Sequence, residues 1–293
     1  MITLSEYIID NISESILSST HTGKAGIEAE LKKYGLNPKK ATLNADGTID
    51  YAGSVSMCNR NLTKIPFKFG VVHGYFDCTY NQLTSLEGCP HTCDSHFDCR
   101  NNNLTTLEGC PRKIGRPGST SENGNLYCSY NKLLTLEGAP KDVYGSLYCQ
   151  CNSLVSLKGC PSSVGYEFNC ANNSLTSLEG GPTNVGRNYF CFSNKLVSLK
   201  GAPSKMKGHF VCYNNDLTNL DGAPREVSVF NCTDNHLVTL KGGPKKVKLY
   251  YSCSNNNLTS LDGVADNCNE LYCEGNPGYE SFLTGPYKDV IIK

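Results

Sequence analysis

The sequence predicts a β-rich solenoid in which short strands stack side by side as one parallel sheet. The motif (Phe/Leu/Tyr)-x-Cys-x-x-Asn-x-Leu-x-x-Leu-x-Gly-x-Pro recurs between Val55 and Asn276, at steps of 20 or 21 residues with one step of 29. Self-similarity at a short fixed period is typical of solenoids, because one unit cannot bury its apolar face alone. The motif cysteines are Cys58, Cys78, Cys99, Cys128, Cys149, Cys170, Cys191, Cys212, Cys232, Cys253 and Cys273.

Length and charge narrow the possible classes of protein. The chain of 293 residues could hold two domains, but a solenoid grows in one dimension without splitting. Its formal net charge of zero argues against a nucleic-acid binder, which would need a basic face. No apolar run approaches the ~18 residues of a membrane span, and the start of the chain does not resemble a secretory signal.

The chain contains 17 cysteines, which in a small secreted protein would suggest a disulfide scaffold. Eleven of them occupy the motif position, where a buried aliphatic residue would serve equally well. Free cysteine behaves as a small hydrophobic residue. We therefore expect reduced thiols in the core of a cytoplasmic protein.

Three segments are predicted in order: an N-terminal leader and cap (1–54), the solenoid (55–276) and a C-terminal cap (277–293). Residues 1–20 are predicted to form an amphipathic helix, and a second helix over 23–34 ends at Gly35. Residues 42–51 are predicted as a hairpin that turns at Asp46-Gly47. Solenoid ends expose core, so these segments should cover the first and last coils.

Two coils depart from the motif. In the first, Asn61 and Leu62 are adjacent, whereas later coils place one residue between asparagine and leucine. An insertion rich in glycine, serine and proline lies within residues 112–124. Because it follows the Gly-x-Pro of its coil, we expect it to bulge from the back or an edge.

Within a coil, Phe76, Cys78, Leu83 and Leu86 should point into the core. The alternation of Phe76 and Cys78 predicts a strand with one buried face. The Leu-x-Gly-x-Pro stretch lacks helical periodicity, so the back of each coil should be extended and free of helix. Glycines such as Gly88 suggest a positive φ or close packing between coils.

The asparagine column has a separate predicted role. The chain turns after each strand while it is buried, and an amide side chain can both donate to and accept from the backbone there. The structural ladder residues include Cys78, Cys99, Cys149, Cys170, Cys191 and Cys212, with Asn81, Asn102, Asn194 and Asn215.

Aromatic residues at outward strand positions are the candidate binding site, on the face predicted to be concave. A patch rich in Tyr and Phe with few charges is typical of a protein interface. The alternative is that aromatic residues simply favour strands and pack on one another. The candidates are Tyr75, Tyr80, Tyr127, Tyr130, Tyr148, Phe190, Phe192, Tyr213, Tyr250 and Tyr272.

No arrangement of residues predicts catalysis, a metal or another cofactor. The six histidines share no spacing, and His73 and His96 are expected to be solvated. Cys149 and Cys151 should face opposite ways, so they cannot share one tetrahedral site. The residues His21-Thr22-Gly23-Lys24 lack the rest of a phosphate-binding loop.

These motifs resemble leucine-rich repeats of the Leu-x-Leu-x-x-Asn-x-Leu type. The short period and helix-free back look like the class found in bacterial type III effectors, whose Leu-Pro pairs are here Leu-Glu-Gly-x-Pro. The resemblance implies a right-handed superhelix, with the parallel sheet concave and a non-enzymatic, protein-binding role. Repeats of Ser-Leu-Glu-Gly-Cys-Pro also resemble repeat proteins of large tailed phages, which implies a host or defence protein as partner and the host cytoplasm as location.

The leader gives a second functional hypothesis. Leu4-Ser5-Glu6 and Ile12-Ser13-Glu14 resemble the (Leu/Ile)-x-Glu cleavage sites of internal head proteins in such phages. This resemblance implies a virion component whose capsid-targeting leader is cleaved after Glu14. The alternative is an ordinary capping helix. Neither the identity of the partner nor the oligomeric state can be predicted from the sequence.

Overall fold

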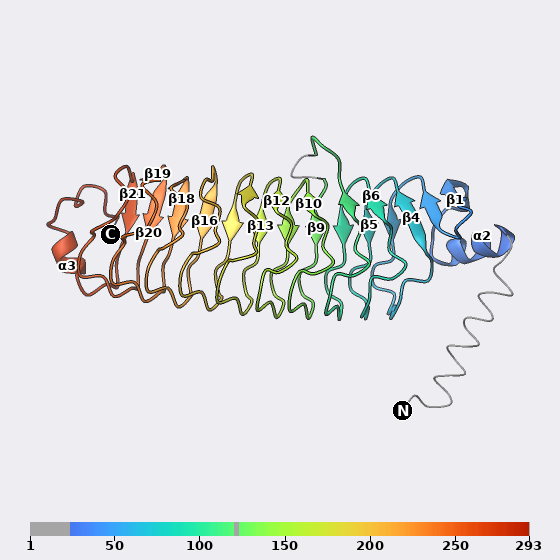
Figure 1. Ribbon diagram of the computed structural model, residues 1–293, viewed down its shortest axis with the longest axis horizontal. Helices are drawn as coiled ribbons and strands as arrows, with labels where there is room; N and C mark the ends of the chain where they lie inside the picture. The colour runs from blue at the N-terminus through green and yellow to red at the C-terminus, as the bar shows by residue number, and fades with distance from the viewer. Residues whose placement is uncertain (1–23, 120–122, 293) are drawn as a thin grey trace, which may run out of the picture.

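The protein forms the predicted β-rich solenoid of parallel strands. The structure is a computed structural model that describes residues 24–119 and 123–292. Its coils lie side by side in one nearly straight row (Figure 1). The predicted leader helix and the cleavage after Glu14 fall outside the described residues. Within those residues, no helix is long and apolar enough to cross a membrane.

One long sheet runs the length of the row and confirms the predicted parallel ladder. It has eleven strands, and each neighbouring pair is parallel. From the N-terminal end they are β3 (Val55–Ser56), β5 (Phe76–Asp77), β7 (Phe97–Asp98), β9 (Leu126–Tyr127), β11 (Leu147–Tyr148), β13 (Phe168–Asn169), β15 (Tyr189–Phe190), β16 (His209–Val211), β18 (Val229–Asn231), β20 (Tyr250–Ser252) and β21 (Glu270–Tyr272).

The back of the coils also carries paired strands, which the sequence analysis did not predict; we call them the second ladder. A corner of three residues, as between Val72 and Phe76, separates them from the long sheet. They form sheets of five, three and two strands. These are β1 (Ala41–Leu43), β2 (Ile49–Tyr51), β4 (Phe69–Val72), β6 (Thr92–Cys93) and β8 (Lys113–Ile114); β10 (Asp142–Val143), β12 (Ser163–Val164) and β14 (Asn184–Val185); and β17 (Glu226–Val227) with β19 (Lys246–Val247).

A signal for the second ladder was present in the sequence. An apolar residue stands three places after the proline of each coil, and its side chain is buried. Valine, which favours strands, occupies most of these positions. The column consists of Cys93, Ile114, Val143, Val164, Val185, Met206, Val227 and Val247.

The core contains the predicted inward residues. Phe76, Cys78, Leu83 and Leu86 are all fully buried. Rings at the first inward position pack on those of the next coil, as Phe76 does on Phe97 with ring centroids 5.8 Å apart. Each such side chain contributes roughly 1.5–3 kcal/mol on burial, so the core grows only as coils are added.

Each ladder asparagine joins its own coil to the preceding one, which confirms its predicted role. Nδ2 of Asn102 donates to the carbonyl oxygens of Cys99 (3.1 Å) and Cys78 (2.9 Å), and Oδ1 accepts from the N–H of Leu83 at 3.0 Å. The same bonds recur at Asn131, Asn152, Asn173, Asn194, Asn215, Asn235, Asn256 and Asn276.

Gly88 has both features that the sequence suggested, a positive φ and close packing against the preceding coil. Gly88 has φ of 88°, and a Cβ on it would lie 2.3 Å from the carbonyl oxygen of Phe67 in the preceding coil. The structure adds a second left-handed position, directly before each ladder asparagine. Tyr80, Tyr130 and Cys151 adopt it with φ of 53–56°, and the asparagines at this position suit it.

The first coil corrects one residue of the predicted cysteine column. Val55 pairs with Phe76, so Met57 rather than Cys58 stands opposite Cys78. Met57 is fully buried, whereas Cys58 is partly exposed. The register was misassigned because Arg60, and not an asparagine, stands at the position equivalent to Asn81 in this coil. With the register moved by one residue, Leu62 takes the usual leucine place, and its N–H donates to Oδ1 of Asn81 at 3.0 Å.

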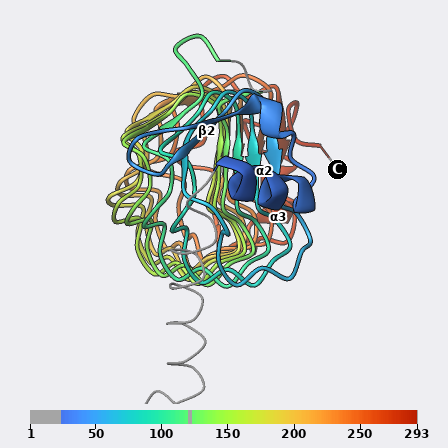
Figure 2. The ribbon, with the colours of Figure 1, turned by 90° about the vertical axis from the view of Figure 1, so that its right-hand side faces the viewer.

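The N-terminal segment lies against the first coil (Figure 2). Helix α2 (Lys24–Lys33) buries Leu31 and ends at Gly35, which has φ of 71°. A 3-10 turn, η1 (Pro38–Lys40), leads into the predicted hairpin of β1 and β2. Strand β2 then pairs in parallel with β4, so the cap extends the second ladder rather than the long sheet.

The insertion lies at a corner. Strand β8 pairs regularly with β6, so the extra residues begin only after Ile114 and end before β9. The described residues of the insertion rise from the edge of the row (Figure 1). An edge was one of the two expected places for it. It is anchored by Arg116, whose guanidinium contacts the carboxylate of Asp94.

The C-terminal residues pack against the last coil. Helix α3 (Tyr279–Phe282) buries Phe282 at 4% exposure. Leu271 of β21 forms a parallel bridge with Ile291, so the chain end continues the long sheet by one short pairing.

Candidate functional site

The outward side of the long sheet, called the sheet face below, carries most of the predicted binding residues. Alternation along each strand leaves the residues on either side of the buried cysteine pointing outward. Tyr80 and Tyr130 lie at the left-handed corner that follows the strand, so they border the sheet face. The column before the cysteine holds Tyr127, Tyr148, Phe190 and Tyr272; the column after it holds Phe192 and Tyr213; Tyr75 and Tyr250 directly precede the first buried strand residue.

Tyr127 and Tyr148 form a stacked pair near the middle of the sheet face. Their ring centroids are 5.0 Å apart and their planes differ by 3°. The guanidinium of Arg100 lies 4.7 Å from the centroid of Tyr127. The Nη2 and Nε atoms of Arg100 donate to the carboxylate of Asp98 at 2.6 Å and 2.9 Å. This pairing orients the guanidinium and raises the pKa of Arg100. The result is a rigid, amphipathic surface.

A second aromatic cluster consists of Phe190, Phe192 and Tyr213. Phe192 stacks on Tyr213, with centroids 4.6 Å apart and planes 7° apart. Phe190 meets Phe192 edge-on at 6.4 Å. All three rings are partly exposed although they pack together. Stacked pairs contribute only about 0.5–1.5 kcal/mol beyond their burial. Because the three rings stay partly exposed, apolar area remains for a partner to cover.

The other five predicted residues are more scattered. Tyr250 and Tyr272 meet edge-on at 5.8 Å near the C-terminal end. The hydroxyl of Tyr272 donates to Glu270 at 3.0 Å, and this carboxylate raises the pKa of Tyr272. Tyr75, Tyr80 and Tyr130 are 42%, 61% and 54% exposed. The predicted set therefore consists of two compact clusters near the middle, one edge-on pair near the C-terminal end and three separate tyrosines.

Three polar atoms on the sheet face were missed by the sequence analysis. Nδ1 of His96, Oγ of Ser129 and Oε1 of Gln150 are buried, yet within the described residues they have no protein hydrogen-bond partner. His96 packs edge-on against Tyr127, and Ser129 and Gln150 stand two residues after Tyr127 and Tyr148. Burial lowers the pKa of His96. The outward column after the cysteine could have indicated Ser129 and Gln150.

The remaining candidates do not assemble a reactive centre. His73 pairs with Asp94 at 2.9 Å, next to Arg116, at an exposed corner. Cys149 is buried, while Cys151 lies in the left-handed corner, as the sequence suggested. Within residues 24–119 and 123–292, no group of three or more His, Cys, Asp or Glu residues is placed to hold a metal ion.

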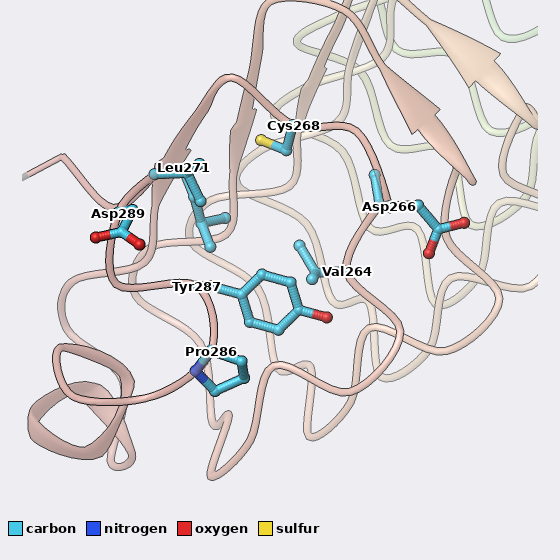
Figure 3. Close-up of a pocket in the computed structure, with 9 residues that line it drawn as sticks. Val264, Asp266, Cys268, Leu271, Pro286, Tyr287 and Asp289 are labelled. Carbon is cyan, nitrogen blue, oxygen red and sulfur yellow. The ribbon is translucent and has the colours of Figure 1, made fainter.

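A small cavity opens beside the C-terminal cap (Figure 3). It measures about 100 Å³, and its lining includes Val264, Cys268 and Tyr287. The thiol of Cys268 is already directed at the carbonyl oxygen of Glu270, 2.8 Å away. Sites for small molecules usually enclose about 300–1,000 Å³, so this gap between the last coil and its cap is too small to be the functional site.

Comparisons with known proteins found similarity at the level of structure only. No protein-family model matches the chain, and no curated protein matches it. Solved structures similar to it include YopM from Yersinia enterocolitica WA-314, at 16% identity and a TM-score of 0.49, over 76% of this chain and 60% of that one. YopM from Yersinia pestis, a leucine-rich effector protein, is similar at 17% identity and a TM-score of 0.41, over 77% and 78%. This chain thus spans 60% of the length of the first.

Proposed function

We propose that this chain binds a protein partner through the sheet face, with the aromatic residues between Tyr127 and Tyr213 at the centre of the contact. The observation that carries the proposal is that stacked rings on the sheet face remain partly exposed. Aromatic residues and arginine are enriched at the energetic centres of protein interfaces. No chemistry of its own is proposed for the chain.

The alternative explanation, that the rings only support the sheet, is weaker. The same outward columns hold Asn169, Asn231 and Thr233 in other coils, and the strands there pair in the same register. The parallel ladder therefore does not require aromatic side chains. Their concentration in the middle coils instead matches a localised contact.

The size of the sheet face is suitable for such a contact. Eleven strands at ~4.8 Å make a face ~48 Å long. Its width is the length of about four extended residues, ~13 Å. The resulting area, on the order of 600 Å², is close to the ~800 Å² that one partner buries in a standard complex.

The finer expectations rest on the sequence resemblance and remain proposals. They are a phage source, a host or defence protein as the partner, and action in the host cytoplasm. The second candidate, a virion component, depends on cleavage after Glu14. Mass spectrometry of the protein from purified virions tests it: a chain that begins at Ser15 supports packaging, and absence of the protein from virions contradicts it.

Site-specific cross-linking tests the sheet face directly. Benzoylphenylalanine is placed at position 192 on the sheet face and, in a matched chain, at position 144, where Tyr144 is exposed at the corner between β10 and β11. We expect one protein to be captured from the cell lysate at position 192 and not at position 144. Quadruple substitution of Tyr148, Phe190, Phe192 and Tyr213 by serine should abolish binding of that protein after it is purified.

Folding is the control for this experiment. The quadruple variant should keep its far-ultraviolet circular dichroism, because the four side chains lie outside the core. If it folds and still binds the captured protein with unchanged affinity, the sheet face is not the interface. Equal capture from positions 192 and 144 would contradict the proposal in the same way.

A further inference from the structure

Basic residues gather on the second ladder near the C-terminal end of the row, although the chain as a whole has no net charge. Six of them stand on three consecutive coils, and all six side chains are exposed. The second-ladder segments of these coils (205–208, 225–228 and 245–248) hold one acidic residue, Glu226. We call this set the basic flank: Lys205, Lys207, Arg225, Lys245, Lys246 and Lys248.

The fold itself does not require these charges. The two preceding coils carry neutral residues at the equivalent positions, namely Ser162 and Ser163, then Thr183 and Asn184. Those coils pair in the second ladder through β12 and β14, so uncharged side chains suffice there. Basic residues recur at equivalent positions of earlier coils, at Arg112, Lys113 and Lys141, but the two neutral coils separate them from the basic flank.

Like charges also lie on adjacent coils. The N–H of Lys245 donates to the carbonyl oxygen of Arg225 at 2.8 Å, which places these two basic side chains in one column. Glu226 and Lys246 are register partners across β17 and β19, but the carboxylate of Glu226 pairs with Nζ of Lys248 at 3.1 Å. Like charges side by side in a ladder oppose its formation. Among the described residues, the other five basic side chains have no carboxylate partner.

We propose that the basic flank binds an acidic segment of a protein, in which several Asp or Glu residues follow one another. Three coils spaced by ~4.8 Å span about 10 Å, which an extended segment of three or four residues covers at ~3.3 Å each. Nucleic-acid binders typically neutralise about 6–10 phosphates, which needs a longer basic surface. The proposal does not depend on the sheet face, because it concerns a different side of the coils.

Fluorescence anisotropy with a labelled decaglutamate peptide tests this proposal on the full chain. We expect binding at low ionic strength that weakens strongly at about 0.3 M salt, where charges are screened within a few ångströms. The variant Lys205→Gln, Arg225→Gln, Lys246→Gln should bind about tenfold more weakly, since three exposed ion pairs are lost. The control variant Lys64→Gln, Lys132→Gln, Lys195→Gln removes the same charge from other exposed positions and should bind within about twofold of the original.

Three results would overturn the proposal: no binding of the peptide at low salt, an equal loss in the control variant, or tighter binding of oligothymidylate or phosphatidylserine vesicles than of the peptide. The quadruple aromatic variant should bind decaglutamate normally. Failure of the basic flank and failure of the sheet face are therefore distinguishable, because each changes a different measurement.

Discussion

The long sheet and the second ladder respond differently to the same insertion. The second ladder stops at the extra residues after Ile114, where β8 ends one sheet and β10 begins the next. It also stops at the coil of Met206, between β14 and β17, although that coil has no insertion. The long sheet continues across the same coils, because β7 and β9 remain paired. Two ladders built on one period are thus not equally robust.

The difference lies in the side chains that join the coils. Asn131 spans the insertion: its Nδ2 donates to the carbonyl oxygen of Cys99 at 3.0 Å and its Oδ1 accepts from the N–H of Leu104 at 3.0 Å. The second ladder has an apolar inward column and glycine corners instead. Both ladders have backbone hydrogen bonds between coils, as from the N–H of Gly165 to the carbonyl oxygen of Val143 at 3.0 Å in the second ladder. A backbone ladder that adds side-chain hydrogen bonds across every step tolerates extra residues better than one that adds only apolar packing.

The largest expected effect is a loss of stability at high pH, which comes from the buried thiols of the long sheet. The long sheet buries thiols, and burial raises the pKa of Cys99, Cys170 and Cys212 far above the usual thiol range. In the unfolded chain these thiols ionise above roughly pH 8.5. The stabilisation is therefore complete below that pH and is lost as pH rises, by up to about 1.4 kcal/mol per pH unit for each cysteine. Urea unfolding followed from neutral pH to about pH 10 should show a steep fall.

A variant with Cys128→Ala, Cys149→Ala and Cys170→Ala is the matched control. It should unfold at a lower urea concentration at neutral pH. Its stability should fall less steeply at high pH, because about three fewer protons are released on unfolding there. A pH dependence as steep as that of the original chain would show that the cysteine column is not its source.

The next effect tests the asparagine column. Substitution of Asn215 by alanine removes its acceptor for the N–H of Leu196 and its donors to the carbonyl oxygens of Cys191 and Cys212. We expect a loss of about 2–5 kcal/mol in the free energy of unfolding, because buried backbone groups are left unpaired. Asn257→Ala, at an exposed position, should change it by at most about 0.5 kcal/mol. Equal effects of the two substitutions in urea unfolding would disprove the role of the ladder.

The smallest effect concerns the corner between the two ladders. A Cβ on Gly186 would lie 1.8 Å from the carbonyl oxygen of Gly165 in the preceding coil. Gly186→Ala should therefore cost about 1–3 kcal/mol, since the backbone must move. Gly118→Ala is the control: its φ of 86° is unfavourable for alanine, but no atom lies within 4 Å of the added Cβ. Hydrogen exchange should show loosening around residue 186 only for the first variant.

Much of the solenoid could be predicted because its determinants repeat. The positions of Phe76, Cys78 and Leu83, and the donor and acceptor roles of Asn102, follow from alternation and from the need to pair buried backbone groups. The first coil was misread at Cys58 because two plausible registers differ by one residue. Only the pairing of Val55 with Phe76 distinguishes them.

The sequence alone determined the period and the inward columns, since each is encoded by neighbouring residues in the chain. Tertiary structure alone decided which outward residues meet. Tyr127 contacts Tyr148, Phe192 contacts Tyr213, and the basic residues of three coils share one flank because coils stack at a fixed spacing. It also decided that the second ladder is broken while the long sheet is not, because that outcome depends on hydrogen bonds between residues about 20 or more positions apart.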